Sequence, residues 1–263
     1  AGAGVNVLAF SNNTTIAGGN VFVLGPTFQT TADRLVSYAA RQGKSRIVVV
    51  SAQDVAGQLG RTSIQNAISR SGATLAGSVD YPLSQQGVID AVPRIKSTVD
   101  SSGADAVFMT SSTASALPLL AQLLPEAGIQ PTVTQYIGLT RWDIPSPTLS
   151  LPGLQGGWFA LPDPARSAAF SAKYQAAYGG TPHPIASLGF DGIAAVGALV
   201  AKGNSNALSG AALTQGAGFQ GASGIFRLRS DGTNDRGLAI ATIRNNQVVV
   251  IDAAPQSFGG AGF

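Results

Sequence analysis

Four apolar runs in the first half of the chain each end in a short segment of polar side chains. The runs are Val5–Phe10, Arg46–Val50, Asp105–Met109 and Val133–Ile137. The side chains that follow these runs are our candidate ligand contacts: Ser11, Asn12, Asn13, Thr14, Thr15, Gln53, Asp54, Thr110, Ser111, Ser112, Thr140, Arg141 and Trp142. Hydroxyls, amides and a guanidinium can hold a small polar molecule, and few of these groups can act as a general acid or base. The sequence therefore predicts a binding site rather than a catalytic one.

The elements that must position these side chains alternate between strand and helix. Apolar residues at helical spacing predict helices over about 30–42, 85–99 and 114–124, and a fourth helix that ends at Gly72. Alternation of strands and helices is typical of a mostly parallel sheet, in which the carboxyl ends of the strands share one edge. Ligands of such folds bind in the crevice outside that edge, so we expect the polar segments to converge there.

The second half of the chain follows a different pattern. Clustered prolines bracket a strand over 157–161 and indicate a crossing segment between two lobes. Helices are expected over 164–178 and 186–201, and the second is nearly all apolar, which predicts burial between a sheet and other helices. Strands around 225–228, 237–244 and 247–251 are separated by turn residues and should pair antiparallel.

Composition narrows the class of protein. Of 263 residues, 44% are hydrophobic and 11% are charged, and the net charge of +3 comes from scattered Lys and Arg, which argues against a nucleic-acid surface. No apolar run is long enough to predict a membrane span. The chain has no cysteine and one histidine, so we expect no metal site and no cofactor. The glycine-rich segments at 2–4 and 259–262 carry no P-loop lysine and predict no phosphate site.

Several candidate residues also have a structural interpretation. Residues 11–15 could form a capping turn, and residues 110–113 could cap the helix over 114–124. Arg141 and Trp142 could bind an anionic or ring-bearing ligand or could equally pack at the lobe junction. Asp54 is more often a surface turn acid than a ligand contact. His183, between two prolines, is expected to be a structural loop residue because no partner orients it as a base.

The expected strands, helices and turns, in their order along the chain, resemble the type 1 periplasmic-binding fold of branched-chain amino-acid receptors and ABC-transporter substrate-binding proteins. The similarity rests on residues 7–13, the helix–strand unit 30–50, the helix 186–200 with Phe190-Asp191-Gly192, and the segment 224–232. Residues 219–234, 249–252 and 257–260 are most similar to α-proteobacterial penicillin-binding-protein activators.

This resemblance implies an α/β fold with two lobes and mostly parallel sheets flanked by helices. Lobe 1 would comprise residues 1–28 and 164–223, and lobe 2 residues 29–163 and 224–263. The first βα units of lobe 1 would lie upstream of residue 1, in a segment on the order of one hundred residues long. The receptors place an aromatic residue where this chain has Val55, and an ammonium-binding acid where it has 139–141, Leu-Thr-Arg. That departure lowers the case for an amino-acid receptor.

The main hypothesis at this point is a non-enzymatic periplasmic protein that regulates peptidoglycan synthesis by contact with a penicillin-binding protein. The alternative is an ABC-transporter substrate-binding protein that holds an amino acid or another small polar solute in the interlobe cleft and delivers it to a permease. A lipid anchor on an upstream segment is compatible with both hypotheses. An enzyme of nucleotide chemistry has little support, since no glycine fingerprint, metal cluster or base is evident.

Overall fold

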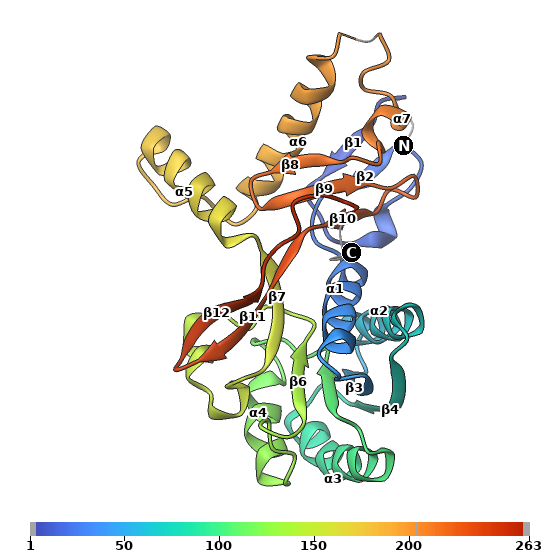
Figure 1. The fold of residues 1–263 in the computed structure, drawn as a ribbon, viewed down its shortest axis with the longest axis vertical. Helices are drawn as coiled ribbons and strands as arrows, with labels where there is room; N and C mark the ends of the chain where they lie inside the picture. The colour runs from blue at the N-terminus through green and yellow to red at the C-terminus, as the bar shows by residue number, and fades with distance from the viewer. Residues whose placement is uncertain (1–3, 204, 260–263) are drawn as a thin grey trace. The chain divides into compact units, whose positions relative to one another are not determined.

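A computed structural model describes residues 4–203 and 205–259 (Figure 1). The glycine-rich segments singled out at the two ends lie mostly outside these residues. The chain divides into two compact units: unit 1 is Ala1–Thr30, Pro162–Ala239 and Ala253–Phe263, and unit 2 is Thr31–Leu161 and Ile240–Asp252. The lobe boundaries expected from the sequence differ from this division, because residues 224–239 and 253–263 group with unit 1.

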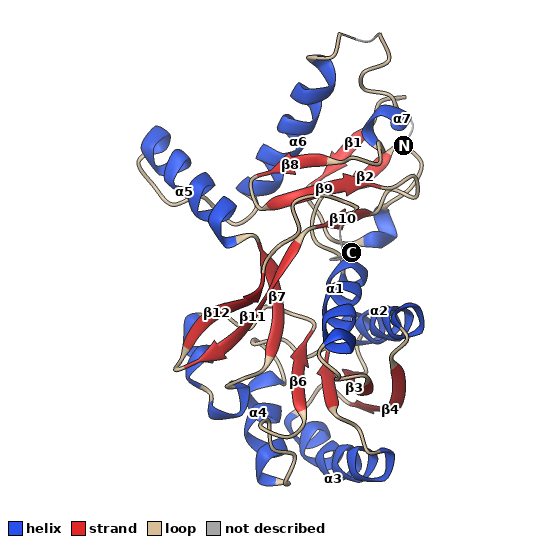
Figure 2. Ribbon diagram, viewed as in Figure 1, coloured by secondary structure: helices blue, strands red, loops and turns tan. Residues whose placement is uncertain are grey.

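Unit 2 contains most of a seven-stranded sheet with the order β12-β11-β7-β6-β5-β3-β4 (Figure 2). Its strands are β3 (Arg46–Ala52), β4 (Thr74–Tyr81), β5 (Ala106–Met109), β6 (Gln135–Gly138), β7 (Trp158–Pro162), β11 (Leu238–Arg244) and β12 (Gln247–Asp252). The neighbours among β3 to β7 pair in parallel, and β11 pairs antiparallel with β12. The predicted mostly parallel sheet is confirmed, and so is the predicted hairpin, whose turn places Asn245 and Asn246 at φ 52° and 61°.

Four helices of this part of the chain are α1 (Phe28–Arg41), α2 (Val55–Ser71), α3 (Gln85–Ser102) and α4 (Leu117–Glu126). The predicted apolar stripe of α3 is confirmed, since Val88, Val92, Ile95 and Val99 are all buried. Ser84 caps this helix by accepting a hydrogen bond from the Gly87 amide at 3.0 Å. The predicted start of α4 at residue 114 is wrong, because residues 113–116 form a turn and the helix begins with a proline in its first turn.

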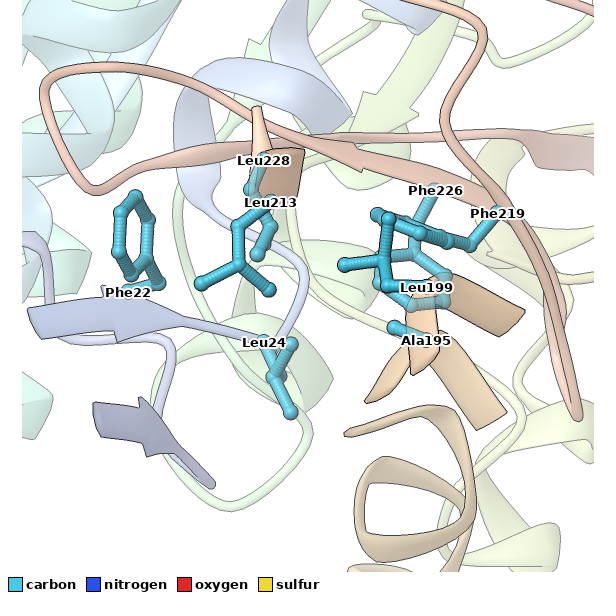
Figure 3. Packing of buried hydrophobic residues seen from close by; sticks show 8 residues of the cluster. All are labelled: Phe22, Leu24, Ala195, Leu199, Leu213, Phe219, Phe226 and Leu228. Carbon is cyan, nitrogen blue, oxygen red and sulfur yellow. The ribbon is translucent and has the colours of Figure 1, made fainter. Parts of the chain in front are cut away.

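Unit 1 has two small sheets. In the first, β1 (Val7–Ala9) pairs in parallel with β2 (Val21–Val23); in the second, β9 (Gly224–Leu228) lies between β8 (Phe219–Gly221) and β10 (Asn234–Arg236) with antiparallel pairing. The eight side chains drawn in Figure 3 form the apolar core of this unit: Phe22, Leu24, Ala195, Leu199, Leu213, Phe219, Phe226 and Leu228.

The helices of unit 1 are α5 (Pro164–Tyr178), α6 (Ala186–Val200) and the short α7 (Gly210–Leu213). The bounds of α5 agree with the prediction, and Asp163 caps it. The expectation that α6 is buried between a sheet and other helices is wrong for part of the helix. One face packs into the core through Ala195 and Leu199, whereas Ile193 is 74% exposed.

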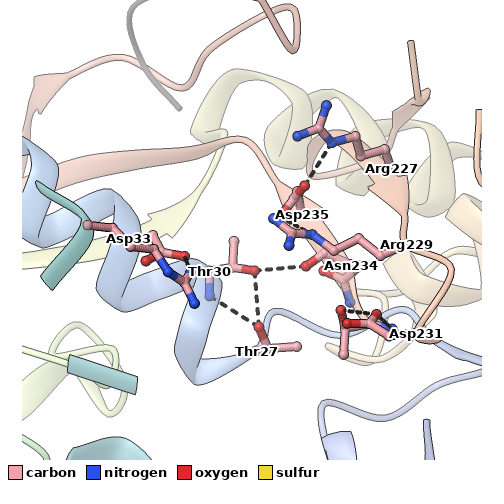
Figure 4. Close-up of polar contacts among 10 residues, drawn as sticks. Thr27, Thr30, Asp33, Arg227, Arg229, Asp231, Asn234 and Asp235 are labelled. Atoms are coloured by element: carbon pink, nitrogen blue, oxygen red, sulfur yellow. Dashed lines mark hydrogen bonds and ion pairs between the residues drawn. The ribbon is translucent and has the colours of Figure 1, made fainter. Parts of the chain in front are cut away.

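Polar contacts also tie the segments of unit 1 together. Asp235 binds Arg227 and Arg229, and the Thr30 hydroxyl donates to the Asn234 carbonyl at 2.9 Å (Figure 4). Arg236 forms an ion pair with Asp191 at 2.8 Å, and both side chains are almost completely buried. Charged groups therefore form part of the interior of unit 1.

Candidate functional site

The carboxyl ends of four parallel strands of unit 2 lie at one edge of the sheet. β6, β5, β3 and β4 are neighbours in that order, and the register aligns Met109 with Gly138 and Val50 with Met109. The segments that follow these strands must therefore lie side by side. This edge carries the candidate residues 53–54, 110–112 and 140–142, and we call it the unit 2 edge.

Hydrogen bonds show that these segments approach each other closely. The Thr140 hydroxyl donates to the Ser111 carbonyl at 3.0 Å, and the backbone amide of Gln53 donates to the Tyr81 carbonyl at 2.9 Å. Helix α2 also approaches the edge at Gly60, where a Cβ would lie 2.7 Å from Leu139 Cδ2 and 3.0 Å from Thr110 Cγ2. Both side chains would have to shift to accommodate a side chain here, so the glycine permits the close approach of α2.

Three hydroxyl groups at this edge are buried without a hydrogen-bond partner in the described part of the chain. They belong to Tyr81, Thr110 and Ser111. Burial is the main cause that raises the pKa of Tyr81 to about 12. The nearby Ser111 hydroxyl lowers this pKa and the Asp54 carboxylate raises it. The hydroxyls of Tyr81 and Ser111 do not reach hydrogen-bonding geometry. Unpaired buried hydroxyls are costly, and they are common where a ligand or an ordered water completes the bonding. The unit 2 edge therefore has unused hydrogen-bonding capacity.

The remaining residues after β3 and β5 are engaged locally. Asp54 caps α2 through a 2.8 Å bond from the Gly57 amide, and Gln53 donates to the Asp80 carboxylate at 2.9 Å. Ser112 forms a turn in which its amide donates to the Ser115 hydroxyl at 3.1 Å. The alternative interpretation of residues 110–113 as the cap of α4 is wrong, because that helix has no side-chain cap.

Arg141 and Trp142 have different surroundings from each other. The Arg141 Nε donates to Asp143 Oδ1 at 2.9 Å, and Nη2 contacts Oδ2 of the same carboxylate. The Trp142 ring is fully buried and stacks on Phe159 with the ring centres 6.0 Å apart. A Cβ on Gly138 would lie 2.2 Å from this ring, so the strand glycine makes room for it. In this structure Trp142 is a core side chain of unit 2.

The candidate residues of unit 1 follow β1 and form a capped turn. Asn13 caps the short 3-10 helix Thr14–Ile16 by accepting from the Thr15 amide at 3.0 Å, and Ser11 accepts from the Asn13 amide at 3.0 Å. The capping interpretation is therefore confirmed for Asn13. Asn12, Thr14 and their neighbour Asn13 are exposed, so their side chains remain accessible in unit 1.

The sequence interpretation missed two residues of the unit 2 edge. Tyr81 is not among the candidate residues, although the buried positions of β4 alternate from Val79 to Tyr81. Asp143 was overlooked as the partner of Arg141, although acid and base lie two residues apart. His183 was expected to be structural, and its Nδ1 accepts a hydrogen bond from the Ile185 amide at 3.3 Å.

A separate hollow of about 500 Å³ lies within unit 1, between α5, α6 and the β8 segment. Its aromatic lining includes Phe170, Tyr174 and Phe190, with Phe170 and Phe190 5.4 Å apart between ring centres. Lys173 adds a cationic group. No candidate residue of the sequence analysis lines this hollow.

Two further properties concern metals and membranes. Among the described residues, no group of three His, Cys, Asp or Glu side chains could hold a metal ion. No helix in the described ranges has the length and apolar character that a membrane crossing requires.

Comparison with known proteins places these features in context. Residues 1–247 match a family model described as periplasmic binding protein. A search of curated proteins found no match.

Solved structures share the fold. A branched-chain amino acid ABC transporter periplasmic ligand-binding protein from Burkholderia xenovorans is 19% identical with a TM-score of 0.72, and the match covers 97% of this chain and 71% of that one. An ABC transporter substrate-binding protein from Desulfitobacterium hafniense is 18% identical with a TM-score of 0.67 and coverage of 88% and 68%. A solute binding protein from R. palustris in complex with benzoate is 18% identical with a TM-score of 0.65 and coverage of 95% and 71%.

Proposed function

The chain belongs to the periplasmic binding protein family, and from this premise we propose that it binds a small polar solute for delivery to an ABC-transporter permease. The proposed location is the periplasm, and the proposed role is non-enzymatic. The family and the reported structures support this solute-binding role, which was the alternative hypothesis from the sequence. The main hypothesis, regulation of a peptidoglycan synthase, gains no support from these comparisons, and neither does a lipid anchor.

The observation that carries this proposal is the group of partnerless hydroxyls at the unit 2 edge. Tyr81 ends β4, and Thr110 and Ser111 directly follow β5; both strands pair in parallel with β3, which lies between them. The hydroxyls of all three residues are buried without a hydrogen-bond partner among the described residues. Leaving a buried hydroxyl unpaired costs about 1–3 kcal/mol. A solute with hydrogen-bonding groups would recover part of that cost on binding. We propose the exposed turn 11–15 as a second ligand-contacting segment, in unit 1.

The test is a thermal-shift screen followed by calorimetry. The purified chain is screened against amino acids, amides, polyols, aromatic acids such as benzoate, and peptidoglycan fragments. Each hit is then titrated into the chain and into Ser111→Ala and Thr140→Val. Ser101→Ala, a change at an exposed position of α3, serves as the control.

We expect at least one solute to bind, with affinity reduced at least fivefold in Ser111→Ala and unchanged in the control. If no solute of any class raises the melting temperature, the proposed function fails. Crosslinking that captures a peptidoglycan synthase and no permease would favour the regulatory hypothesis instead.

A further inference from the structure

We propose that the part of the ligand bound at the unit 2 edge is uncharged, so that the protein selects a carboxamide or polyol over a carboxylate of similar shape. This inference rests on the proposed function, because it concerns the ligand of the same site. It follows from the charges at the edge. The two features that would attract a carboxylate are each occupied by a carboxylate of the chain itself.

The first of these features is the Arg141 guanidinium. Asp143 engages Nε and Nη2 through both carboxylate oxygens, which occupies one forked edge of the guanidinium and neutralises its charge. The Asp143 side chain is only 13% exposed. A ligand carboxylate that displaced it would leave Asp143 poorly solvated and unpaired, and such a group is costly. Arg141 is therefore a charge-neutralised group, and a ligand carboxylate gains less from it than from an unpaired guanidinium.

The second feature is the amino-terminal end of α2, a helix of seventeen residues that points away from the edge. The positive end of a helix dipole favours an anion. Asp54 already supplies that anion, since its side chain accepts from the Gly57 amide at 2.8 Å. A second carboxylate placed here would meet a like charge and find this amide already bonded.

Among the described residues, the buried side-chain groups that lack a partner at this edge are uncharged. The hydroxyls of Thr110 and Ser111 have no partner in the described part of the chain, and a hydroxyl can both donate and accept. A carboxamide or an alcohol also donates and accepts, and it loses little solvation free energy on entering such a site. A carboxylate loses far more, and no free cation among the candidate residues compensates for it.

The experiment compares ligands of similar shape in which a carboxylate is replaced by an uncharged group. Benzoate is paired with benzamide and propionate with propionamide, and gluconate is compared with sorbitol. Each compound is titrated calorimetrically into the whole chain, alongside any hit from the solute screen and its acid or amide counterpart. We expect the neutral member to bind at least tenfold more tightly.

Substitution of Asp143 then tests the physical cause. Asp143→Asn keeps the shape of the side chain and releases the Arg141 guanidinium, so we expect carboxylate affinity to rise at least tenfold. Asp143→Ser provides the same test if the first variant does not fold, as judged by its melting curve. Asp100→Asn removes a carboxylate of equal charge from the exposed pair with Lys96 on α3, and it should change nothing.

The outcomes separate this inference from the proposed function. Tighter binding of the carboxylate member, or no gain in a folded Asp143 variant, overturns the inference and leaves the solute-binding role intact. Absence of binding by every solute overturns the proposed function and the inference with it.

Discussion

The buried ion pair of unit 1 gives the strongest prediction for stability. Asp191 is 0% exposed, accepts from Arg236 and also accepts from the Ala222 amide at 2.6 Å. The Arg236 Nε donates to the Leu24 carbonyl at 2.6 Å, and its guanidinium lies 5.0 Å from the centre of the Phe226 ring. The pair thus connects α6, β10 and Leu24, the residue that follows β2. Removal of either charge leaves the other buried and uncompensated.

We expect Asp191→Ala and Arg236→Met each to lower the free energy of unfolding of unit 1 by about 3–5 kcal/mol. The double variant should cost about as much as one single change, because it leaves no unpaired charge behind. With a urea m-value of about 2 kcal/mol/M, each single change shifts the unfolding midpoint by roughly 1.5–2.5 M.

The assay uses two probes. Both tryptophans, Trp142 and Trp158, belong to unit 2, so their fluorescence follows the unfolding of that unit. Far-UV circular dichroism follows both units, and the shift should be present in its transition. Hydrogen exchange at β10 and α6 locates the change within unit 1.

The loss of unfolding free energy caused by Arg236→Met should also depend on pH, which gives a second test of the buried ion pair. Burial raises the pKa of Asp191, and Arg236 and the Ala222 amide oppose that rise. Without Arg236 the pKa of the folded protein should rise further above that of the unfolded chain. Stability of the variant relative to wild type then falls as pH rises from about 4 through the folded pKa. The cost should therefore be larger at pH 8 than at pH 5.

Two results would refute this reasoning. One is a cost below about 1 kcal/mol for each single change, which would mean that the pair is hydrated rather than buried. The other is a double variant whose cost equals the sum of the two single changes, since independent sites add and a coupled pair does not.

Further predictions concern tyrosines and glycines of unit 2 and unit 1. Tyr136→Phe removes a hydroxyl that donates to a backbone carbonyl and should lower the free energy of unfolding by about 1 kcal/mol, as measured with urea. Tyr81→Phe removes a hydroxyl that has no partner among the described residues and should be neutral or stabilising. Because burial raises the pKa of Tyr81 to about 12, its contribution to stability should decline as pH rises from about 10 to 12, and Tyr81→Phe should flatten that decline; an unchanged alkaline profile would contradict this assignment. Gly138→Ala places a methyl group within 2.2 Å of a buried indole and should lower stability by about 1–3 kcal/mol, whereas Gly197→Ala faces open space on α6 and should raise it by up to about 1 kcal/mol, both measured by thermal unfolding.

Local patterns in the sequence were enough to predict most of the secondary structure. The apolar stripe of α3, the bounds of α5 and the Asn245–Asn246 hairpin depend on residues close together in the chain, so their spacing defines them. The mostly parallel sheet also followed from the order of strands and helices. A parallel sheet also predicts that three polar segments meet at one edge, because the carboxyl ends of parallel strands lie on the same side.

Tertiary structure decided what each polar side chain does at that edge. Trp142 is buried because glycines on two separate segments, at 138 and 157, leave room for its ring, and no local pattern around residue 142 shows this. The Tyr81 and Ser111 hydroxyls have no partner within the described ranges, and their positions depend on the pairing of β3 with β4 and β5. Residue types thus determined which groups could bind a solute. Which of them remain unpaired depends on packing between segments distant in sequence, and that packing exists only in the folded chain.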